Sequence, residues 1–491
     1  MPRRNWLALP VIGLVSLACW QASQGAKPKD ELFELYGMFV DAVEKVEANY
    51  VRPVSRKELL EAALQGMLQG LDQHSSYINM GEWRQFRKQI EGRFGGIGIQ
   101  VGVDPETGRL RVIAPMVGTP AYEAGILAGD QIMEIDGQST EGMSPDKAVE
   151  VLTGRPGTQV TLSVLHEGTE KTETVTITRA LIEISSVLGD RRKPNDQWDF
   201  MLDPENRIGY IRISSFIQST AEDLTKALAQ LQQEGARGLI LDLRDNPGGL
   251  LSAAVEVSDL FLDNGKIVST EGRNTISKSY LAQKGSPYED LELVVLINQN
   301  SASASEIVAA ALQDNNRATV VGQRSYGKGS VQNILELEDG NSVLKLTVAS
   351  YHRPNGANIH RFRDSKATDD WGVSPSPGME VKLSPSEYVR WFVGRRERDL
   401  RSAAKGQRPR PAEGAETKSS APRGEETEGA EPAQDHKSGE EPKKGESETV
   451  PPPATIRSPH AEVGPFVDKV LDKALEVLRD KLRANQKAKA A

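Results

Sequence analysis

The stretch from residue 296 to residue 332 holds the densest group of residues that could do chemistry. Leu296-Ile297-Asn298-Gln299-Asn300 ends a predicted strand, and Ser301-Ala302-Ser303-Ala304-Ser305-Glu306 leads from it into an apolar segment with helical spacing. A turn of small residues between a strand and a helix can expose a serine nucleophile, with helix-terminal N–H groups ready to hold an oxyanion. The same letters also fit a plain helix N-cap of Ser and Glu, so this segment alone leaves both interpretations open.

A second candidate is Lys328, which stands between Gly327 and Gly329. Glycines let the backbone bend tightly and let other segments approach closely, which is unusual around a solvated surface lysine. A lysine that acts as general base must be neutral, and burial can lower a lysine pKa from about 10.4 towards about 7–8. Gln332 follows at a spacing that puts both side chains on one side of a helix or strand. Its amide could orient the amine without adding charge, and the spacing does not match a GxxxxGK[ST] phosphate loop.

A third segment runs from Asp242 to Gly249 and ends in Pro247-Gly248-Gly249. Such a turn offers freely oriented N–H groups of the kind an oxyanion hole needs. By itself it fits an ordinary strand-to-helix turn equally well.

Other serine chemistries have weaker support. No GxSxG motif is present, and the six histidines suggest no triad. Ser325 with Lys328 is the one SxxK pair that stays open, although Gly327 between them argues against the helix that this pattern requires. The SxxK pattern starts at Ser144, Ser325, Ser342 and Ser402.

Composition limits the remaining function classes. The chain has 491 residues, which suggests several domains, and a hydrophobic content of 38%, which suggests that part of it does not fold. The net charge is −9 and no basic face for nucleic acid is evident. Cys19 is the single cysteine, so an internal disulfide and a Cys-pair zinc site are excluded. We expect no metal, nucleotide or other cofactor.

The N-terminus predicts export. Arg3 and Arg4 precede an uncharged run from Trp6 to Trp20, about the length of a signal-peptide core, and cleavage is expected near Ala26. An uncleaved membrane anchor and a lipid anchor on the cysteine remain alternatives. We expect a periplasmic or cell-envelope location.

The elements that must position the candidate residues follow from periodicity. Residues 30–90 show helical spacing, and residues 91–180 show short strands with glycine punctuation and a helix beginning at Ser144. Residues 181–390 alternate strands and helices, which predicts an α/β core with largely parallel strands. Strands are expected at 208–213, 238–243 and 293–297, and helices at 221–233, 251–262 and 305–312.

The C-terminal part has a different character. Residues 411–449 contain no Leu, Ile, Val, Met, Phe, Tyr or Trp, so the sequence predicts a disordered acidic insert there. Beyond it, an apolar stripe predicts an amphipathic helix that packs on the α/β core. The stripe consists of Val467, Leu471, Ala474, Leu475, Leu478 and Leu482.

Together, and in this order, these segments resemble the C-terminal processing peptidases, the tail-specific serine proteases. The resemblance extends over about residues 30–390. Leu71 to Tyr77 looks like the motif that precedes the PDZ module in this family, and Gly95 to Ile99 looks like the carboxylate-binding loop of the module. Further segments similar to the PDZ signature are Thr119-Pro120-Ala121, Ala124-Gly125-Ile126, Gly129-Asp130-Gln131-Ile132 and Ile135-Asp136-Gly137.

The resemblance assigns a role to each candidate residue. It implies Ser303 as nucleophile, selected over Ser301 and Ser305 by the family spacing, with Lys328 as general base and Gln332 positioning the lysine. It implies an oxyanion hole made by the N–H of Ala304 and that of Gly248 or Gly249. The PDZ loop that would hold a substrate carboxylate consists of Gly96, Ile97, Gly98 and Ile99.

The implied fold is a crotonase-like α/β catalytic core with an inserted α+β PDZ domain, an N-terminal helical region and the acidic insert before a C-terminal helix. The expected divisions are a signal or anchor over 1–26, the helical region over 27–90, the PDZ domain over 91–180, the protease core over 181–394, the disordered linker over 395–460 and the last helix over 461–485.

Two positions depart from the family pattern. Thr153 stands where many relatives carry a basic residue before a glycine, which puts a coupling of peptide capture to activation in doubt. Ser376 stands where relatives often have Asp. Neither change is expected to remove catalysis.

The expected partners are proteins with free, apolar C-termini, captured by strand addition to the PDZ domain. A homo-oligomer through the N-terminal helices and an adaptor protein are further expectations. Two other function classes remain as alternatives: a catalytically silent PDZ scaffold, and an acyl-CoA enzyme suggested only by the core fold.

Overall fold

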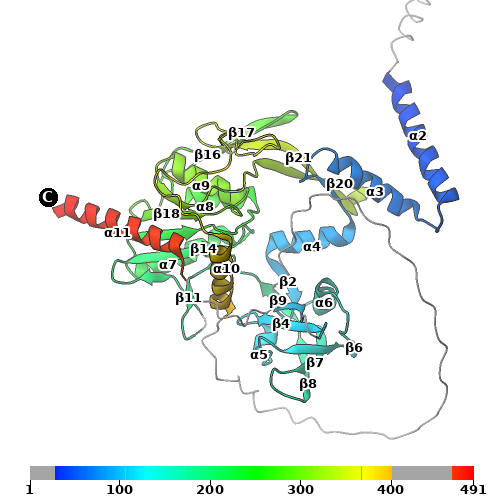
Figure 1. The fold of residues 1–491 in the computed structure, drawn as a ribbon, viewed down its shortest axis with the longest axis horizontal. Helices are drawn as coiled ribbons and strands as arrows, with labels where there is room; N and C mark the ends of the chain where they lie inside the picture. The colour runs from blue at the N-terminus through cyan, green and yellow to red at the C-terminus, as the bar shows by residue number, and fades with distance from the viewer. Residues whose placement is uncertain (1–27, 105–106, 196, 367, 401–466, 491) are drawn as a thin grey trace, which may run out of the picture. The chain divides into compact units, whose positions relative to one another are not determined.

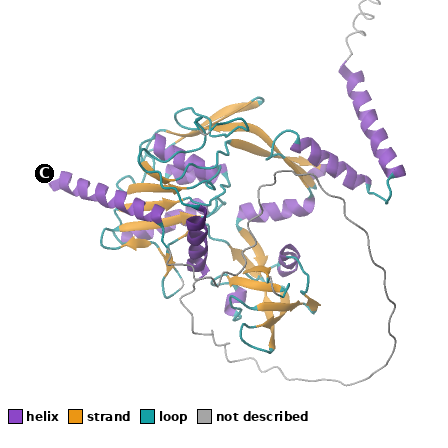
Figure 2. Ribbon diagram, in the orientation of Figure 1, coloured by secondary structure: helices purple, strands orange, loops and turns teal. Residues whose placement is uncertain are grey.

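The computed structural model describes residues 28–104, 107–195, 197–366, 368–400 and 467–490. It is a mixture of helices and strands, coloured by type in Figure 2. These residues form two compact units, one from residues up to Arg84 together with Ser330–Ala349, and one from Gln85–Gly329 together with the residues from Ser350 onward. The predicted signal or anchor lies outside the described residues, as does the predicted linker over 395–460 except for its first residues, which belong to the helix that ends at Leu400.

The first unit confirms the predicted N-terminal helices and adds a strand. It contains α2 (Pro28–Asn49), α3 (Arg56–Gln69), β1 (Ser76–Ile78), the start of α4 (Met80–Glu91), β20 (Ser330–Leu337), the 3-10 turn η2 (Glu338–Gly340) and most of β21 (Ser342–His352). β1 pairs antiparallel with β21. Asp72 forms the turn before β1, because its Oδ1 accepts the N–H groups of His74 and Ser75.

The PDZ part of the second unit is an antiparallel sheet with one main helix. Its strands run in the order β3-β4-β5-β7-β8, with β6 paired to β5, so β3 is an edge strand. The elements are β2 (Arg93–Gly96), β3 (Ile99–Val103), β4 (Leu110–Pro115), α5 (Pro120–Glu123), β5 (Gln131–Ile135), β6 (Gln138–Ser139), α6 (Pro145–Leu152), β7 (Gln159–Leu165), β8 (Thr172–Thr178) and β9 (Ala180–Glu183).

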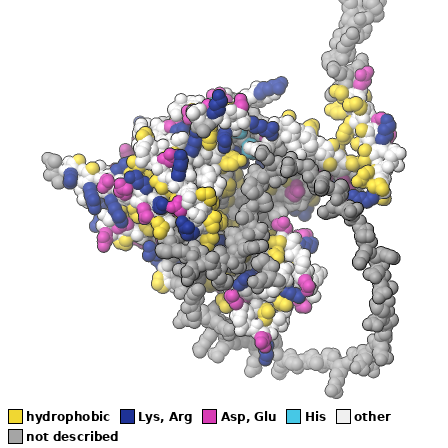
Figure 3. Space-filling model, in the orientation of Figure 1, with side chains coloured by type: hydrophobic (Ala, Val, Ile, Leu, Met, Phe, Trp, Pro, Cys, Tyr) yellow, Lys and Arg dark blue, Asp and Glu magenta, His cyan; other side chains and the backbone are white. Residues whose placement is uncertain are grey.

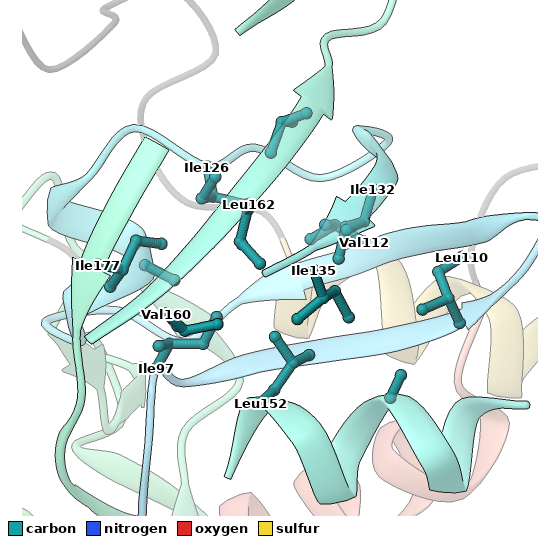
Figure 4. Packing of buried hydrophobic residues seen from close by; sticks show 13 residues of the cluster. Ile97, Leu110, Val112, Ile126, Ile132, Ile135, Leu152, Val160, Leu162 and Ile177 are labelled. Carbon is teal, nitrogen blue, oxygen red and sulfur yellow. The ribbon is translucent and has the colours of Figure 1, made fainter. Parts of the chain in front are cut away.

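The core of this domain follows from alternation along its strands. In β4, Leu110, Val112 and Ala114 are buried while the residues between them are half-exposed, as expected for a strand with one buried face. These side chains meet those of α6 and the other strands in one apolar cluster, seen from close by in Figure 4. Ser144 caps α6 as predicted, since its hydroxyl accepts the N–H of Lys147 at 3.3 Å.

The α/β core of the second unit confirms the predicted parallel strands. β14 (Ile208–Ile213), β15 (Gly238–Asp242), β18 (Glu292–Ile297) and β19 (Ala318–Gly322) pair in parallel in this order. β10 (Val187–Leu188) and β13 (Met201–Asp203) pair antiparallel with β14. Every residue of β15 is buried, which is typical of a parallel strand covered on both faces.

Helices cover this sheet. α7 (Thr220–Gln233), α8 (Leu251–Asp259) and α9 (Ala304–Asp314) pack on one another and on the strands, close to their predicted ranges. The remaining elements of this unit are β11 (Arg191–Arg192), β12 (Trp198–Asp199), the hairpin β16 (Lys266–Gly272) and β17 (Thr275–Leu281), α10 (Pro385–Leu400) and α11 (Lys469–Ala490), all traceable in Figure 1.

α11 confirms the predicted C-terminal helix on the α/β core. Its residues Leu471, Ala474, Leu478 and Leu482 are buried in an apolar cluster with side chains of β14, β15, β18 and β19. Val467 precedes the helix and is 56% exposed, while Val470 is buried in its place. Among the described residues, no helix is both long and apolar enough to cross a membrane.

Candidate active site

Ser303 occupies the junction between β18 and α9. It has φ +56° and ψ −113°, a backbone conformation that is rare for a residue with a side chain and that persists where the surroundings enforce it. Its carbonyl already accepts the N–H of Ile307 as the first turn of α9 forms. The small residues that the sequence places before α9 therefore build a strained turn with a serine at its tip.

The hydroxyls of the three serines in this turn differ in the hydrogen bonds that they donate. Ser301 Oγ donates to the carbonyl of Leu243 at 2.8 Å, and Ser305 Oγ donates to the carbonyl of Asn246 at 2.9 Å. Both residues are fully buried. Within the described part of the chain, the Ser303 hydroxyl donates to no carbonyl, so it is the one of the three that a substrate could meet.

Glu306 joins the serine turn to the lysine segment. Its carboxyl is fully buried and accepts four hydrogen bonds. Oε2 accepts the N–H groups of Ser303 and Lys328, each at 2.8 Å, and Oε1 accepts the N–H of Gly327 and the Ser325 hydroxyl, each at 2.6 Å. Burial raises the pKa of Glu306 above its ordinary value, against the lowering effect of these four donors. The sequence analysis treated Glu306 only as part of a helix cap, because the S-x-x-E pattern from Ser303 is the capping-box signature and carries no sign of the contacts with Gly327 and Lys328.

The glycines on either side of Lys328 are required by close packing, as predicted. A Cβ on Gly329 would lie 2.2 Å from the backbone nitrogen of His360. Gly327 has φ +88°, and a Cβ there would lie 2.7 Å from the Cβ of Arg361. The Arg361 N–H also donates to the Gly327 carbonyl at 2.8 Å. The segment around His360 thus holds the lysine backbone in place while the Lys328 side chain is half-buried.

Gln332 lies on β20, in the first unit. Its Nε2 donates to Ser330 Oγ at 2.8 Å and to Thr347 Oγ1 at 3.4 Å. The amide is therefore itself oriented by two hydroxyls of the β20–β21 pair.

Ser325, the alternative nucleophile, has a structural role. It is buried, and its hydroxyl donates to Glu306 Oε1 while accepting the N–H of Val373 at 2.7 Å. Residues 325–328 form no helix, so the arrangement that an SxxK motif requires is absent from this described segment.

The first of the two glycines in the predicted oxyanion turn approaches the serine closely, while the second packs against the backbone of Phe216. Gly248 has φ +98°, and a Cβ there would lie 2.7 Å from Ser303 Cβ and 2.9 Å from the Ala304 nitrogen. Its N–H donates to Asn246 Oδ1 at 2.9 Å. Gly249 has φ +147°, and its N–H, like that of Ala304, makes no hydrogen bond within the described residues. Ala304 and Gly249 therefore offer the unoccupied donors beside Ser303.

Asn246 locks this turn to the serine turn. Its carbonyl accepts the N–H of Ala302 at 3.0 Å and the Ser305 hydroxyl, while its side-chain amide donates to the Ile213 carbonyl at 2.7 Å. Asn246 is fully buried. It is a second contributor to the site that sequence reasoning did not single out.

The predicted carboxylate loop connects β2 to β3 in the PDZ part. The carbonyl of Ile97 accepts the N–H of Ala121, and that of Gly98 accepts the N–H of Met116 and the Thr119 hydroxyl. Gly98 has φ +78°, and a Cβ there would lie 2.4 Å from Thr119. With its carbonyls held by the protein, the loop leads into edge strand β3, which lies against α6.

An arginine from outside α6 supports the C-terminal end of this helix. Thr153 ends α6 and Arg155 is exposed. Arg179 is buried instead and donates to the carbonyls of Val151 and Leu152 at the end of the helix. The residue that follows β8 thereby fixes the C-terminal end of α6.

Comparison with known proteins places this site in a family. Residues 207–367 match peptidase family S41, and residues 85–165 match the PDZ domain. A carboxy-terminal-processing protease of Bartonella bacilliformis is 38% identical over 375 residues, covering 75% of this chain and 80% of the relative. A carboxyl-terminal-processing protease of Synechocystis is 40% identical, covering 68% of this chain and 74% of the relative. The carboxy-terminal processing protease CtpA of Bacillus subtilis is 35% identical, covering 69% of this chain and 68% of the relative.

The α/β core, the PDZ domain and the helix-borne serine therefore define a serine peptidase of family S41. Within that family, the chain belongs to the carboxy-terminal-processing proteases.

Proposed function

We propose that this chain cleaves proteins near their C-termini with a dyad of Ser303 and Lys328. The proposal rests on one observation: one oxygen of the Glu306 carboxyl, Oε2, accepts the backbone N–H groups of both Ser303 and Lys328. Two segments that are distant in sequence are thereby tied to one buried group, which fixes the serine backbone relative to the lysine backbone.

The chemistry is acyl transfer. Neutral Lys328 Nζ accepts the Oγ proton of Ser303 as Oγ attacks the substrate carbonyl carbon. The N–H groups of Ala304 and of Gly249 or Gly248 hold the oxyanion, and an oxyanion donor contributes about 3–4 kcal/mol. The lysine then gives its proton to the departing amine, and an acyl-enzyme remains. Water attacks the ester, its proton passes to the lysine, and the serine regains a proton as the new carboxylate leaves. Gln332 orients the lysine amine.

Substrate capture uses the PDZ domain. An extended C-terminus adds as a strand to β3 beside α6, and its carboxylate meets the N–H groups of the loop from Gly96 to Ile99. The apolar side chains of Leu152 and its neighbours favour an apolar terminal residue.

The location and assembly of the protein are part of the same proposal. Residues 1–26 act as a signal or anchor, so the protease is exported and works in the periplasm or cell envelope. Its substrates are proteins, and an adaptor protein is a further proposed partner. Apolar side chains gather along α2 (Figure 3), where Phe33, Tyr36 and Met38 are 78%, 61% and 66% exposed. These exposed apolar side chains support a homo-oligomer through the N-terminal helices. The domain boundaries given above stay predictions.

The test uses the protein without residues 1–26 and an unfolded protein that ends in apolar residues. Mass spectrometry should show fragments with the parent and with Lys284→Ala, an exposed control. Ser303→Ala and Lys328→Ala should lower the rate by about 10³-fold or more. If Ser303→Ala cleaved as fast as the parent, the assignment of Ser303 as nucleophile would be wrong, and Ser325 would be the next serine to test. Capture of C-terminal peptides without cleavage would favour a catalytically silent PDZ scaffold. Turnover of a thioester substrate would favour an acyl-CoA enzyme.

A further inference from the structure

A buried charge cluster lies at the end of β15, directly before the turn with the two oxyanion glycines. Arg244 is fully buried between two carboxylates. Its Nη2 donates to Asp242 Oδ2 at 2.6 Å and to Asp468 Oδ2 at 2.8 Å, and its Nη1 donates to Asp468 Oδ1 at 2.8 Å. The pairing with Asp468 is a two-bond fork, the geometry in which an arginine holds a carboxylate most rigidly.

Asp468 belongs to a remote part of the chain. It follows Arg244 by 224 residues and immediately precedes α11. Its carboxylate also accepts the N–H of Leu471 at 3.0 Å and the Trp391 Nε1–H at 2.9 Å, and the Trp391 ring lies 4.5 Å from the Arg244 guanidinium carbon. The aspartate is therefore itself fixed by α10 and α11 before it holds the arginine.

The residue after Arg244 is held by the same helix α10. Asp245 has φ +54°, and its Oδ1 accepts the Tyr388 hydroxyl at 2.9 Å. The same oxygen accepts the side-chain amides of Asn298 and Asn300, both from the segment that leads to the serine turn. The loop formed by residues 244–249, which we name the oxyanion loop, is thus fixed at its start by the C-terminal helices and at its end by the serine turn.

Given the proposed function, on which this step rests, we propose that Asp468 is a positioning residue for the oxyanion loop and acts through Arg244. Asp468 touches no substrate in this role. It fixes the direction of the Arg244 side chain, and the arginine fixes the backbone from which Gly248 and Gly249 present their N–H groups. A small displacement of those donors matters, because misplacement by about 1 Å can cost about 10²-fold in rate.

Removal of this carboxylate leaves a specific defect. Arg244 keeps Asp242, whose Oδ2 also accepts the Tyr210 hydroxyl at 2.7 Å. In Asp468→Asn, however, one of the two oxygens that accept from the guanidinium is replaced by an N–H₂ donor, so at least one guanidinium N–H loses its acceptor in a buried site. Unsatisfied buried donors of a charged group are costly. The guanidinium is expected to turn away, and the oxyanion loop to move with it.

The experiment compares the purified full chain with Asp468→Asn and with Asp480→Asn, an exposed aspartate on the same helix. With the unfolded substrate, we expect Asp468→Asn to lower kcat by about ten- to a hundredfold and to leave KM within about twofold, since outright loss of one oxyanion donor costs about 10²–10³ in kcat. A merely structural role would lower the melting temperature and leave kcat per folded molecule unchanged.

Amide hydrogen exchange supplies a readout that does not need activity. Exchange in residues 244–250 should be at least about tenfold faster in Asp468→Asn than in Asp480→Asn, because the loop opens locally more often. Equal exchange and equal kcat in the two variants would overturn the inference. If the parent itself fails to cleave, the proposed function fails, while the exchange comparison still decides the role of Asp468.

Trp391→Phe covers the case in which Asp468→Asn does not fold. It keeps an aromatic ring beside Arg244 and removes the Nε1 donor to Asp468, together with part of the ring volume. A fall in kcat of about two- to fivefold is expected from a lost hydrogen bond of ordinary strength, with faster exchange in the oxyanion loop. Parent-like values for both quantities in this variant would contradict the inference.

Discussion

The backbone N–H groups of Ser303 and Lys328 donate to the same oxygen atom, Oε2 of Glu306, at 2.8 Å each. A dyad needs a nucleophile and a base at a fixed separation, and side-chain rotamers can fix it only when the two backbones are fixed first. The buried carboxyl does this for segments that lie on either side of α9 and β19.

Replacing this carboxyl tests the anchoring directly. Glu306→Gln keeps the shape but turns one acceptor into an N–H₂ donor that faces N–H and O–H donors, and a buried unsatisfied donor costs about 1–3 kcal/mol. We expect proteolytic activity to fall by about 100-fold or more, measured as kcat. Glu256→Gln, at an exposed position of α8, should behave as the parent. Activity of Glu306→Gln within about twofold of the parent would show that the carboxyl is dispensable.

The packing around Lys328 predicts the effect of an added methyl group. Gly329→Ala would place a Cβ 2.2 Å from the backbone nitrogen of His360, so one of the two segments must move. We expect loss of most peptidase activity and a lower melting temperature. Gly66→Ala, in the middle of α3 with nothing within 4 Å of the new Cβ, should be stabilising by about 0.5–1 kcal/mol. Full activity of Gly329→Ala would mean that the lysine tolerates displacement.

The carboxylate loop predicts a preference for substrates with a free C-terminus. The parent should cleave a peptide with a free C-terminal carboxylate faster than the same peptide with a C-terminal amide. The difference should appear as a lower KM for the peptide with the free carboxylate. Gly98→Ala forces a Cβ to within 2.4 Å of Thr119 at φ +78° and should remove most of this preference while kcat at saturation changes little. Equal KM for acid and amide in the parent would contradict capture by this loop.

The charge cluster around Arg244 predicts a pH dependence of stability. Burial alone would raise the pKa of Asp468, but the Arg244 guanidinium and two other donors, the Leu471 N–H and the Trp391 Nε1–H, outweigh it, and the pKa lies below its ordinary value. A lowered folded-state pKa contributes stability that is complete above the unfolded value of about 3.9 and is lost as the pH falls below it.

Thermal unfolding between pH 3 and pH 6 measures this contribution. The parent should exceed Asp468→Asn in melting temperature at pH 6, and the gap should narrow towards pH 3 as the parent loses a contribution that the variant never had. A gap that widens with falling pH would have the wrong sign for an aspartate held ionised by Arg244.

Local patterns in the sequence account for most of the core. The strand 208–213 was predicted with the bounds that β14 has, because a short apolar run between turn residues leaves few alternatives. The helical region predicted over 30–90 also contains the short strand Ser76–Ile78, whose partner lies more than 260 residues away. The sequence around β1 carries no local sign of that pairing.

The residues that support the candidate site were harder to find in the sequence than the residues proposed to react. Ser303 and Lys328 stand in unusual local contexts of small residues and glycines, so the letters themselves draw attention. Glu306 looked like a helix cap, and Asp468 looked like a polar residue before an amphipathic helix. Their importance comes from contacts between distant segments, which spacing along one segment cannot reveal.

The position of Asp468 in the chain has a consequence for how the enzyme comes into being. A polypeptide is made from its N-terminus, so Ser303, Lys328 and the oxyanion glycines all emerge from the ribosome well before Asp468. A growing chain then already holds the proposed nucleophile and base, but the fork on Arg244 is still missing. If Asp468 positions the oxyanion loop as proposed, a chain that stops before residue 468 is expected to cleave more slowly than the full chain, so proteolytic activity would rise only late in synthesis.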